Sequence, residues 1–224
     1  MNGRHEVKHS ISPGDYWELR SRLRAVLYPD SHADAGGIYT IRSLYFDDAD
    51  DTALRQKLDG IRDRDKYRIR YYNNDTDFIN LEKKSKRDQC CLKQSASLTK
   101  EECERILAGD IDWLNSREGL LQELYRKMKY EGLRPQTIVD YVRDPFVYPA
   151  GNVRVTLDHD IRTGMRCTDF LDPDCVTVPI TENVIILEVK WDSYLPDIVR
   201  DAVRIPNRTA SAFSKYAACR IYDF

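Results

Sequence analysis

Basic residues alternate with aromatic and aliphatic ones along residues 66–72, which read Lys-Tyr-Arg-Ile-Arg-Tyr-Tyr. Successive side chains of a β-strand point to opposite faces, so Lys66, Arg68 and Arg70 would share one face. Two adjacent cations on that face repel each other by roughly 2 kcal/mol at an effective dielectric constant of about 20. Such a face requires water, carboxylates or a bound anion. Arginine suits an anion that carries phosphate, because its planar guanidinium binds two oxygens at once.

The same alternation recurs in several other segments with the composition of strands. In each of them the charged side chains lie opposite apolar ones. The charged positions are Glu6, Lys8, Lys66, Arg68, Arg70, Glu82, Lys84, Lys93, Arg143, Arg154, Glu188 and Lys190. Two arrangements account for this pattern. In a sheet closed into a barrel, the charged faces would line a tunnel for a polyanion and a divalent cation; in an α+β sandwich, they would face solvent.

The remaining elements must position these strands. The predicted strands cover residues 4–11, 38–47, 66–72, 78–86, 89–97, 137–143, 153–158 and 184–191. Helices are predicted after capping signals: Ser12-Pro13 begins one that runs to about residue 28, the Thr99/Glu102 capping box begins a second, and Ser116 begins a third. Further helices are predicted through residues 53–58, 196–203 and 209–221. Residues 1–224 contain no repeat or linker, which predicts a single domain.

Composition narrows the classes of function. The net charge is −2 and the pI about 6.1, which argues against a general nucleic-acid binder. There is no signal peptide at the start and no apolar run long enough for a transmembrane helix, so we expect a cytoplasmic protein. The six cysteines match no zinc or redox motif and are expected to be reduced and mostly structural.

The sequence lacks the motifs of several common catalytic and nucleotide-binding sites. It has neither G-x-x-x-x-G-K-[ST] nor G-x-G-x-x-G, so no glycine loop of either kind cradles a phosphate, and it has no G-x-S-x-G elbow. The four histidines lack the spacing of metal ligands. A bound nucleotide would therefore be held by side chains.

Eight short motifs, in order, resemble one known family. They are Arg4-His5-Glu6-Val7-Lys8, Ser43-Leu44-Tyr45-Phe46-Asp47, Lys66-Tyr67-Arg68-Ile69-Arg70-Tyr71, Leu81-Glu82-Lys83-Lys84, Tyr141-Val142-Arg143, Arg154-Val155-Thr156-Leu157-Asp158, Leu187-Glu188-Val189-Lys190 and Phe213-Ser214-Lys215-Tyr216. Together they resemble the VTC domain, the polyphosphate polymerase domain of the triphosphate tunnel metalloenzymes, a CYTH-like superfamily. The resemblance covers nearly the whole chain.

The resemblance implies an α+β fold in which a closed antiparallel eight-stranded β-barrel has a charged bore and helices packed outside. It implies transfer of the terminal phosphoryl group of ATP to a polyphosphate chain, with Mn²⁺ or Mg²⁺ as cofactor. The catalytic residues that it implies are Lys8, Arg68, Arg70, Lys84, Arg143, Arg154 and Glu188. The implied substrate-binding residues are Lys66, Lys93, Lys190, Lys215, Tyr141 and Ser214. Glu188 is the implied metal ligand, with Glu6 and Glu82 as further candidates.

One difference in the first predicted strand bears on which branch of that superfamily the chain resembles. Its triphosphatase members carry E-x-E-x-K in the first strand, whereas this chain has Arg4 in place of the first glutamate. That difference favours the polymerase branch. Two alternatives stay open: a tripolyphosphatase or nucleoside triphosphatase, and a non-catalytic module that binds polyphosphate. The candidate ligands are ATP or another nucleoside triphosphate, polyphosphate, tripolyphosphate and pyrophosphate, and Asp158 is either a ligand or a counter-charge for Arg154.

Overall fold

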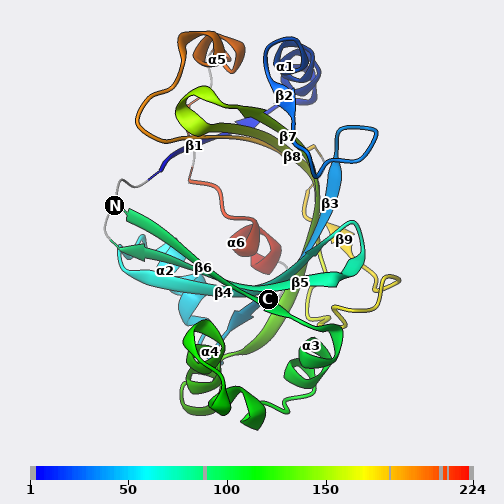
Figure 1. The fold of residues 1–224 in the computed structure, drawn as a ribbon, viewed down its shortest axis with the longest axis vertical. Coiled ribbons are helices and arrows are strands. Elements are labelled where there is room, and N and C mark those ends of the chain that lie inside the picture. Colours follow the sequence, from blue (N-terminus) through cyan, green and yellow to red (C-terminus); the bar gives the residue numbers. More distant parts are fainter. Residues whose placement is uncertain (1–3, 88–89, 182, 207–208, 211, 222–224) are drawn as a thin grey trace. The chain divides into compact units, whose positions relative to one another are not determined.

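Long antiparallel strands and short helices make up the chain (Figure 1). The computed structural model describes residues 4–87, 90–181, 183–206, 209–210 and 212–221. The strands are β1 (His5–Ile11), β2 (Tyr28–Pro29), β3 (Tyr39–Asp47), β4 (Arg64–Tyr72), β5 (Asp75–Arg87), β6 (Cys90–Leu98), β7 (Arg134–Tyr148), β8 (Val153–Thr163), β9 (Val178–Pro179) and β10 (Ile185–Trp191). The helices are α1 (Pro13–Val26), α2 (Thr52–Leu58), α3 (Lys100–Leu107), α4 (Gly119–Tyr130), α5 (Asp197–Ala202) and α6 (Lys215–Arg220), with short 3-10 turns η1 (Asp112–Ser116) and η2 (Ala150–Asn152).

These elements belong to two compact units. Unit 1 comprises Met1–Thr40, Tyr141–Ile161 and Pro179–Ser214. Unit 2 comprises Ile41–Asp140, Arg162–Val178 and Lys215–Phe224.

In unit 1, β10 pairs antiparallel with β1 on one side and β8 on the other. The apolar face of these strands is covered by α1 and α5, which lie on the same side of them (Figure 1). Its buried side chains include Leu19 and Leu23 of α1, Val199 and Ala202 of α5, and Val155, Leu157, Leu187 and Val189 of the strands. Each fully buried leucine or valine among them stabilises the fold by about 1.5–3 kcal/mol.

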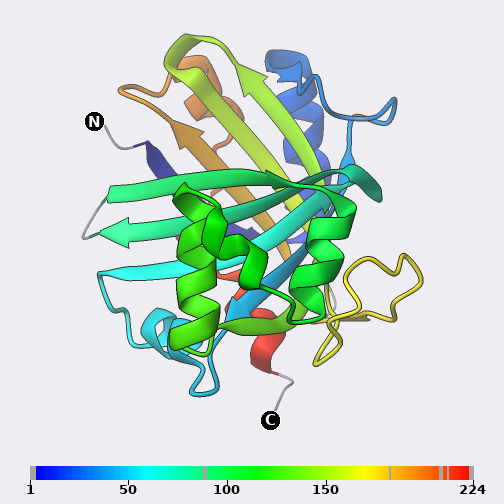
Figure 2. The same ribbon diagram turned by 60° about the horizontal axis from the view of Figure 1, so that its bottom comes forward.

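In unit 2, β3, β4, β5 and β6 pair antiparallel in that order. Helices α3 and α4 cover the apolar face of these strands (Figure 2). Its buried side chains include Leu44, Ile69 and Leu81 of the strands, Cys103 and Ile106 of α3, and Leu120 and Leu124 of α4. In both units these helices lie on one face of the strands. In unit 2 a further helix, α6, packs on part of the opposite face, where the Tyr216 ring stacks 5.0 Å from that of Tyr45.

Capping and turn residues explain where helices α1 and α3 begin and where the chain reverses between β4 and β5. Ser12 accepts a hydrogen bond from the backbone N–H of Asp15 and caps α1, and Thr99 does the same for α3 with Glu102. Both caps are reciprocal capping boxes. Asn73 and Asn74 both have positive φ, at 51° and 57°, as the tight turn between β4 and β5 requires.

Three expectations about elements were wrong. Ser116 does not cap a helix, because it ends the 3-10 turn η1 and α4 begins at Gly119. The last helix is shorter than residues 209–221 and spans Lys215–Arg220. Strand β7 extends well beyond the predicted 137–143 at both ends, although Pro135 and Pro145 lie in it.

The α+β class is confirmed, since antiparallel strands and helices form the structure. Hydrogen bonds between the described strands do not close the sheet into a ring. The closed eight-stranded barrel therefore stays a prediction.

Candidate functional site

The uncovered face of unit 1 carries the charged residues of β1, β10 and β8. Register shows this directly, because residues directly opposite each other in paired strands share a face. The paired positions on this face are Glu6, Lys8, Ser10, Ile186, Glu188, Lys190, Arg154, Thr156 and Asp158. We call it the unit 1 charged face. The predicted sidedness of these strands is confirmed within the unit.

Two carboxylates share two ammonium groups on this face. Lys8 Nζ lies 2.9 Å from Glu6 Oε1 and 3.2 Å from Glu188 Oε1. Lys190 Nζ lies 2.8 Å from Glu188 Oε2 and 3.5 Å from Glu6 Oε2. The Glu188 side chain is only 8% exposed, so these interactions are weakly screened by water. The cluster brings together four of the residues for which metal or phosphate roles were predicted, Glu6, Lys8, Glu188 and Lys190.

Arg143 of β7 joins this cluster through a buried aspartate. Its Nε and Nη2 atoms donate to the two carboxylate oxygens of Asp158 at 2.6 and 2.8 Å, a bidentate pair. Its Nη2 also lies 3.9 Å from Glu188 Oε2, and the guanidinium lies 5.4 Å from the ring centre of Tyr141. Asp158 therefore balances Arg143, which the sequence did not indicate.

The ion pairs shift the pKa values of these groups strongly. Burial alone would lower the pKa of Lys8, but the Glu188 and Glu6 carboxylates outweigh burial and raise it. Burial would raise the pKa of Glu188, yet Lys190, Lys8 and Arg143 hold it well below the ordinary value. Lys8 and Glu188 are therefore both charged at neutral pH.

Arg154 has different partners from those expected. Its Nη2 lies 2.9 Å from Asp30 Oδ2 and donates to the hydroxyl of Tyr39 at 2.5 Å. Neither Asp30 nor Tyr39 was predicted as part of a site, because both lie outside the alternating charged segments. Arg154 is nevertheless on the unit 1 charged face by register.

The face of the unit 2 strands opposite α3 and α4 is more basic. Its paired positions include Ser43, Tyr45, Lys66, Arg68, Arg70, Asn80, Glu82, Lys84, Lys93, Ser95 and Ser97. We call it the unit 2 charged face. With Arg64 and Lys86, which pair on the same face, these positions hold seven cations and one carboxylate. The opposite positions, such as Leu44, Ile69 and Leu81, face α3 and α4.

Three cations converge on that single carboxylate. Arg68 Nε donates to Glu82 Oε2 at 2.7 Å, Lys93 Nζ lies 2.6 Å from Oε1, and Arg70 Nη1 lies 3.9 Å from Oε2. Burial would raise the pKa of Glu82, but Arg68 and Arg70 outweigh it and lower the pKa to about 2. Glu82 is thus a structural anchor for the basic side chains.

Hydroxyl groups that the charge pattern did not reveal complete the arrangement. Arg68 Nη1 donates to the Tyr45 hydroxyl at 2.8 Å, and Arg70 Nε donates to Ser43 Oγ at 2.9 Å. Burial alone would raise the pKa of Tyr45, but Arg68 and Arg70 lower it to about 8. The sequence signal that could have identified these hydroxyl groups was the alternation of Ser43 and Tyr45, which places both side chains on one strand face.

The other predicted residues lie on the unit 2 charged face or at the start of α6. Burial lowers the pKa of Lys66 to about 8, and its Nζ lies 5.3 Å from the ring centre of Tyr216 in α6. Lys84 is exposed on the unit 2 charged face. Lys215 is the first residue of α6 and Ser214 precedes it, both partly buried.

Glu6 and Glu188 fit a divalent metal better than Glu82 does. Mg²⁺ is usually held by one or two carboxylates together with phosphate oxygens of the substrate. Glu6 and Glu188 reach the same two ammonium groups, so their oxygens border one small volume. Among the described residues, no group of three or more His, Cys, Asp or Glu side chains is placed to hold a metal ion. The chain thus offers a two-carboxylate site that substrate oxygens would complete.

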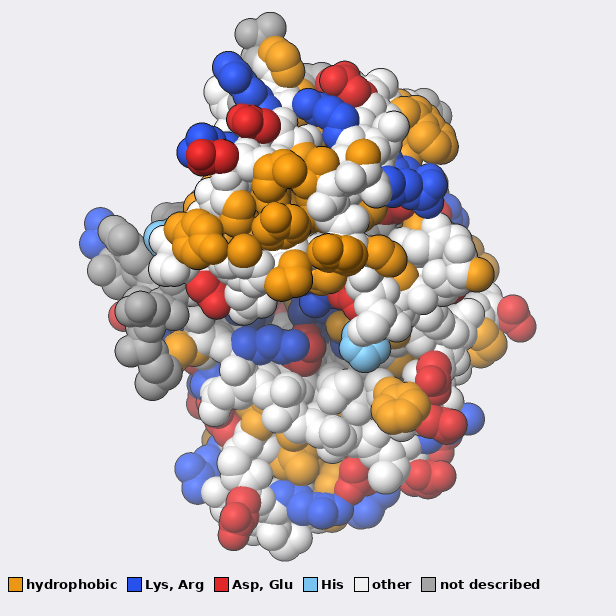
Figure 3. Space-filling model, turned by 45° about the horizontal axis from the view of Figure 1, so that its top comes forward, with side chains coloured by type: hydrophobic (Ala, Val, Ile, Leu, Met, Phe, Trp, Pro, Cys, Tyr) orange, Lys and Arg blue, Asp and Glu red, His pale blue; other side chains and the backbone are white. Residues whose placement is uncertain are grey.

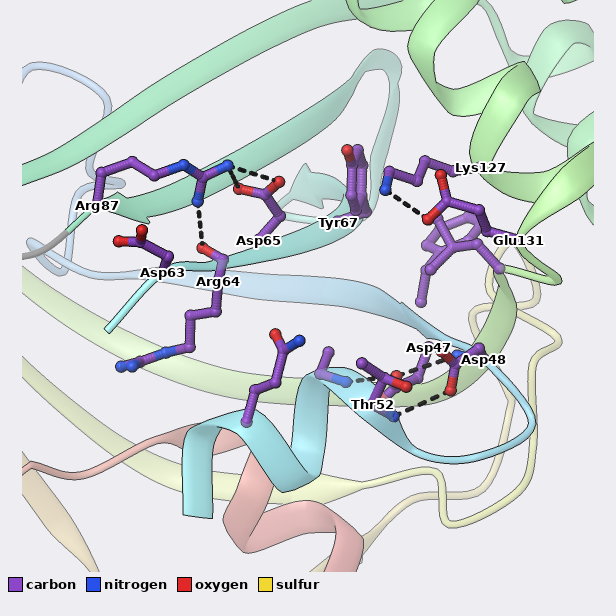
Figure 4. A pocket seen from close by; sticks show the side chains of 14 residues that line it. Asp47, Asp48, Thr52, Asp63, Arg64, Asp65, Tyr67, Arg87, Lys127 and Glu131 are labelled. Atoms are coloured by element: carbon purple, nitrogen blue, oxygen red, sulfur yellow. Dashed lines mark hydrogen bonds and ion pairs between the residues drawn. The ribbon is translucent and has the colours of Figure 1, made fainter. Parts of the chain in front are cut away.

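Unit 2 also has a pocket of about 400 Å³ (Figure 4). Asp65 and Tyr67 line it, and these residues alternate with Lys66 and Arg68, so they point to the other face of β4. Two ion pairs lie among its charged side chains: Arg87 donates to Asp65 at 2.9 Å, and Lys127 to Glu131 at 2.6 Å. None of the residues predicted for the candidate site lines this pocket.

Comparison with known proteins identifies the family. The VTC domain matches residues 3–222 of the chain. The chain belongs to the VTC-domain family. No curated protein sequence matches it.

Solved structures extend this VTC-domain comparison. A candidate adenylate cyclase from Bacillus halodurans shares 16% identity, with 86% of this chain and 83% of that chain covered and a TM-score of 0.51. A candidate adenylate cyclase from Vibrio parahaemolyticus shares 11% identity over 90% of this chain and 83% of that one, with a TM-score of 0.46. A protein from Pyrococcus horikoshii shares 13% identity over 89% and 85%, with a TM-score of 0.45. The first similarity shows a common fold.

No described helix has the length and apolarity needed to cross a membrane. Hydrophobic side chains do gather on the face seen in Figure 3, and the exposed large ones of unit 1 include Trp17, Tyr28, Tyr194 and Ile198.

Proposed function

We propose that this VTC domain is a polyphosphate polymerase that transfers the terminal phosphoryl group of ATP to a polyphosphate chain with the help of a divalent metal. The observation that carries the proposal is the sidedness of the strands. In each unit, helices cover the apolar face, and the arginines and lysines gather on the other. Family membership supports a triphosphate tunnel fold, and the two charged faces supply side chains of the kind that such a tunnel needs.

The unit 2 charged face is suited to hold phosphates. Among its paired positions, seven cations (Arg64, Lys66, Arg68, Arg70, Lys84, Lys86 and Lys93) accompany the single carboxylate of Glu82, so an anion is favoured there by charge alone. Arg68 and Arg70 are held in place by Glu82, Tyr45 and Ser43, and this support reduces the entropy lost when they bind an anion. Arginine also matches the geometry of two phosphate oxygens.

The unit 1 charged face is suited to the metal and the reacting phosphate. Lys8, Lys190 and Arg143 balance Glu6, Glu188 and Asp158, three charges against three. A bound metal would be held by Glu6 and Glu188 and would neutralise charge on phosphate oxygens. Lys8 and Lys190 would then exchange a carboxylate partner for a phosphate oxygen.

This arrangement suits phosphoryl transfer because that reaction asks little covalent chemistry of the protein. Positioning the donor and acceptor and neutralising charge on the transferred group provide most of the catalysis. The acceptor in polymer growth is a phosphate, which is already an anionic nucleophile. No serine or cysteine nucleophile is needed, and the described part of both charged faces supplies cations instead.

One assay separates the proposal from its alternatives. The purified protein is incubated with ATP and Mn²⁺ or Mg²⁺, and long phosphate polymer and free phosphate are both measured. Polymer supports the polymerase. Free phosphate without polymer would show a triphosphatase, with water as acceptor. Neither product, together with tight binding of polyphosphate by calorimetry, would show a non-catalytic binding module.

Arg70→Ala tests the role of the basic strand. Arg70 is only 4% exposed and lies centrally on the unit 2 charged face. A hydrogen bond to a charged group contributes about 1.5–3 kcal/mol, so tripolyphosphate should bind about 10- to 100-fold more weakly and turnover should be lost. Calorimetry and the polymer assay measure the two effects.

The matched control is Arg105→Ala. Arg105 lies on α3, which covers the opposite face, and its ion pair with Asp110 is half exposed. This variant should keep both affinity and turnover. If Arg70→Ala folds and binds tripolyphosphate as the unaltered protein does, the unit 2 charged face is not the phosphate site.

A further inference from the structure

Two cysteines of unit 2 lie side by side in the loop between β8 and β9. The Sγ atoms of Cys167 and Cys175 are 2.9 Å apart, although eight positions separate the residues. Both side chains are partly exposed, so a small reagent can reach them. The other described cysteines differ: Cys103 and Cys219 are buried, and Cys91 is exposed on β6. Cys167 and Cys175 therefore differ from these other cysteines both in the contact between their sulfur atoms and in their partial exposure to solvent.

The loop is fixed to unit 2 by its residues between the two cysteines. Phe170 is fully buried and its ring centre lies 4.8 Å from that of Tyr71. The Tyr71 hydroxyl donates to the carbonyl oxygen of Phe170 at 2.9 Å. Because the middle of the loop is anchored, its two ends approach each other in the folded state and the thiols meet.

A second anchor acts on the other half of the loop. Arg42 Nη1 donates to the carbonyl oxygen of Asp172 at 2.5 Å. The guanidinium is itself held by Asp140, to which Nε and Nη2 donate at 3.0 and 2.9 Å. Near the cysteines the backbone turns back, since Cys167 N–H donates to the Gly164 oxygen at 2.9 Å. The contacts of Phe170 and Asp172 with unit 2 thus hold the loop in the shape that brings the two thiols together.

A zinc site or a packing role would fit the cysteine pair less well than redox chemistry does. No group of three or more metal-ligating side chains occurs among the described residues, which leaves no structural zinc site of the usual kind here. Cys167 and Cys175 border the apolar core of unit 2 but are not enclosed in it, unlike Cys103. Two partly exposed thiols in contact have one common chemistry, which is oxidation to a disulfide.

We propose that Cys167 and Cys175 are a modification site, a dithiol that forms a reversible disulfide within the chain when it meets a low-molecular-weight disulfide. The proposal does not rest on the proposed function, because both residues lie outside the two charged faces.

The reaction proceeds by two exchanges. The Cys167 thiolate attacks one sulfur of the small disulfide, whose S–S bond breaks, and the first small thiolate leaves and takes up a proton. Cys175 then loses its proton to solvent and attacks Cys167 Sγ, which releases the second small thiol. The two cysteines lose two electrons in total, and the small disulfide is reduced to two thiols.

The order of these steps has a physical reason. Burial and the hydrogen bond with Cys167 raise the pKa of Cys175 to about 12, so Cys175 is the poorer first nucleophile. Once Cys167 is part of a mixed disulfide it can no longer carry a negative charge. The contribution of Cys167 to the raised pKa then disappears, and the second exchange becomes easier.

Formation of the disulfide should stabilise the protein by restricting the unfolded chain. For a closed loop of about eight residues, and a protein of this size, loop entropy corresponds to an increase in Tm of roughly 5–10 °C. Little change is needed in the folded state, because the anchors at Phe170 and Asp172 already hold the loop closed.

Peptide mapping tests the proposal directly. The whole protein is incubated with oxidised or reduced glutathione, quenched with acid, alkylated with N-ethylmaleimide and digested with trypsin. Trypsin cleaves after Arg166 and Lys190, with no Lys or Arg between, so both cysteines fall in one peptide. After oxidation this peptide should lack two hydrogens and carry no alkyl group. After reduction it should carry two alkyl groups, and Tm should be lower by the amount above.

Two variants complete the experiment. Cys175→Ser should carry one glutathione on the peptide and show no increase in Tm, since the second exchange has no nucleophile. Cys91→Ser should behave as the unaltered protein, because Cys91 is exposed and lies in β6. Two glutathiones on the 167–190 peptide, a disulfide to another cysteine, or a disulfide without any increase in Tm would each overturn the proposal.

Discussion

Replacing Asp158 with Asn should be the most damaging single change on the unit 1 charged face. The Asp158 side chain is 0% exposed and that of Arg143 is 12% exposed, and their bidentate contact has distances of 2.6 and 2.8 Å. An amide keeps the shape but loses the charge, and it turns one acceptor oxygen into a donor that faces the guanidinium. Arg143 then remains buried with only the 3.9 Å contact to Glu188 as a charged partner among the described residues.

The magnitude follows from the cost of an uncompensated buried charge. Removing one partner of a buried pair destabilises proteins by about 3–5 kcal/mol. For a chain of this size, Tm should fall by roughly 6–20 °C. Urea unfolding followed by circular dichroism measures the free energy directly.

The matched control is Asp192→Asn. Asp192 pairs with Arg4 at 3.1 Å, but the two side chains are 45% and 41% exposed. A surface pair of this kind contributes about 0–1 kcal/mol. If Asp158→Asn costs no more than Asp192→Asn, water reaches the Arg143 pair and the view of a buried, charge-balanced cluster is wrong.

Two pH-dependent predictions concern the unit 2 charged face. The pKa of Glu82 is about 2 against an ordinary 4.5, so its contribution to stability is fully present above pH 4.5 and is lost as the pH falls towards 2. The free-energy difference between the unaltered protein and Glu82→Gln should therefore shrink by about 3 kcal/mol between pH 5 and pH 2, and a constant difference would contradict the ion-pair assignment. The Tyr45 phenol, with a pKa of about 8, should ionise near that pH in a difference absorbance titration against Tyr45→Phe. Tripolyphosphate should raise this pKa because it neutralises Arg68 and Arg70, and an unchanged midpoint would mean that phosphate binds elsewhere.

The sequence pattern was largely sufficient to predict which side chains share one face of a strand. Alternation in residues 66–72 placed Arg68 and Arg70 on one face of β4, and the register with β3 and β5 confirms it. This works because the side chains of a strand alternate regardless of tertiary context. The capping boxes at Ser12 and Thr99 were equally visible, since each depends on residues three positions apart.

The partners of these residues were not predictable. Asp158 pairs with Arg143 and not with Arg154, which instead contacts Asp30 and Tyr39. Such pairings join residues from different strands and loops, and no spacing in the sequence encodes them. The same holds for Cys167 and Cys175, whose spacing matches no redox motif and whose contact depends on the anchored loop.

The order of residues along the chain is enough to specify the two-sided strands, the capped helices and the excess of cations on one side. These are short-range properties, set by side-chain periodicity and by hydrogen bonds within a turn. Which carboxylate neutralises which cation depends instead on the folded chain, because the strength of an ion pair is set by distance and burial. Those two quantities arise when strands from distant parts of the chain pair, and they set the pKa values on which the chemistry depends.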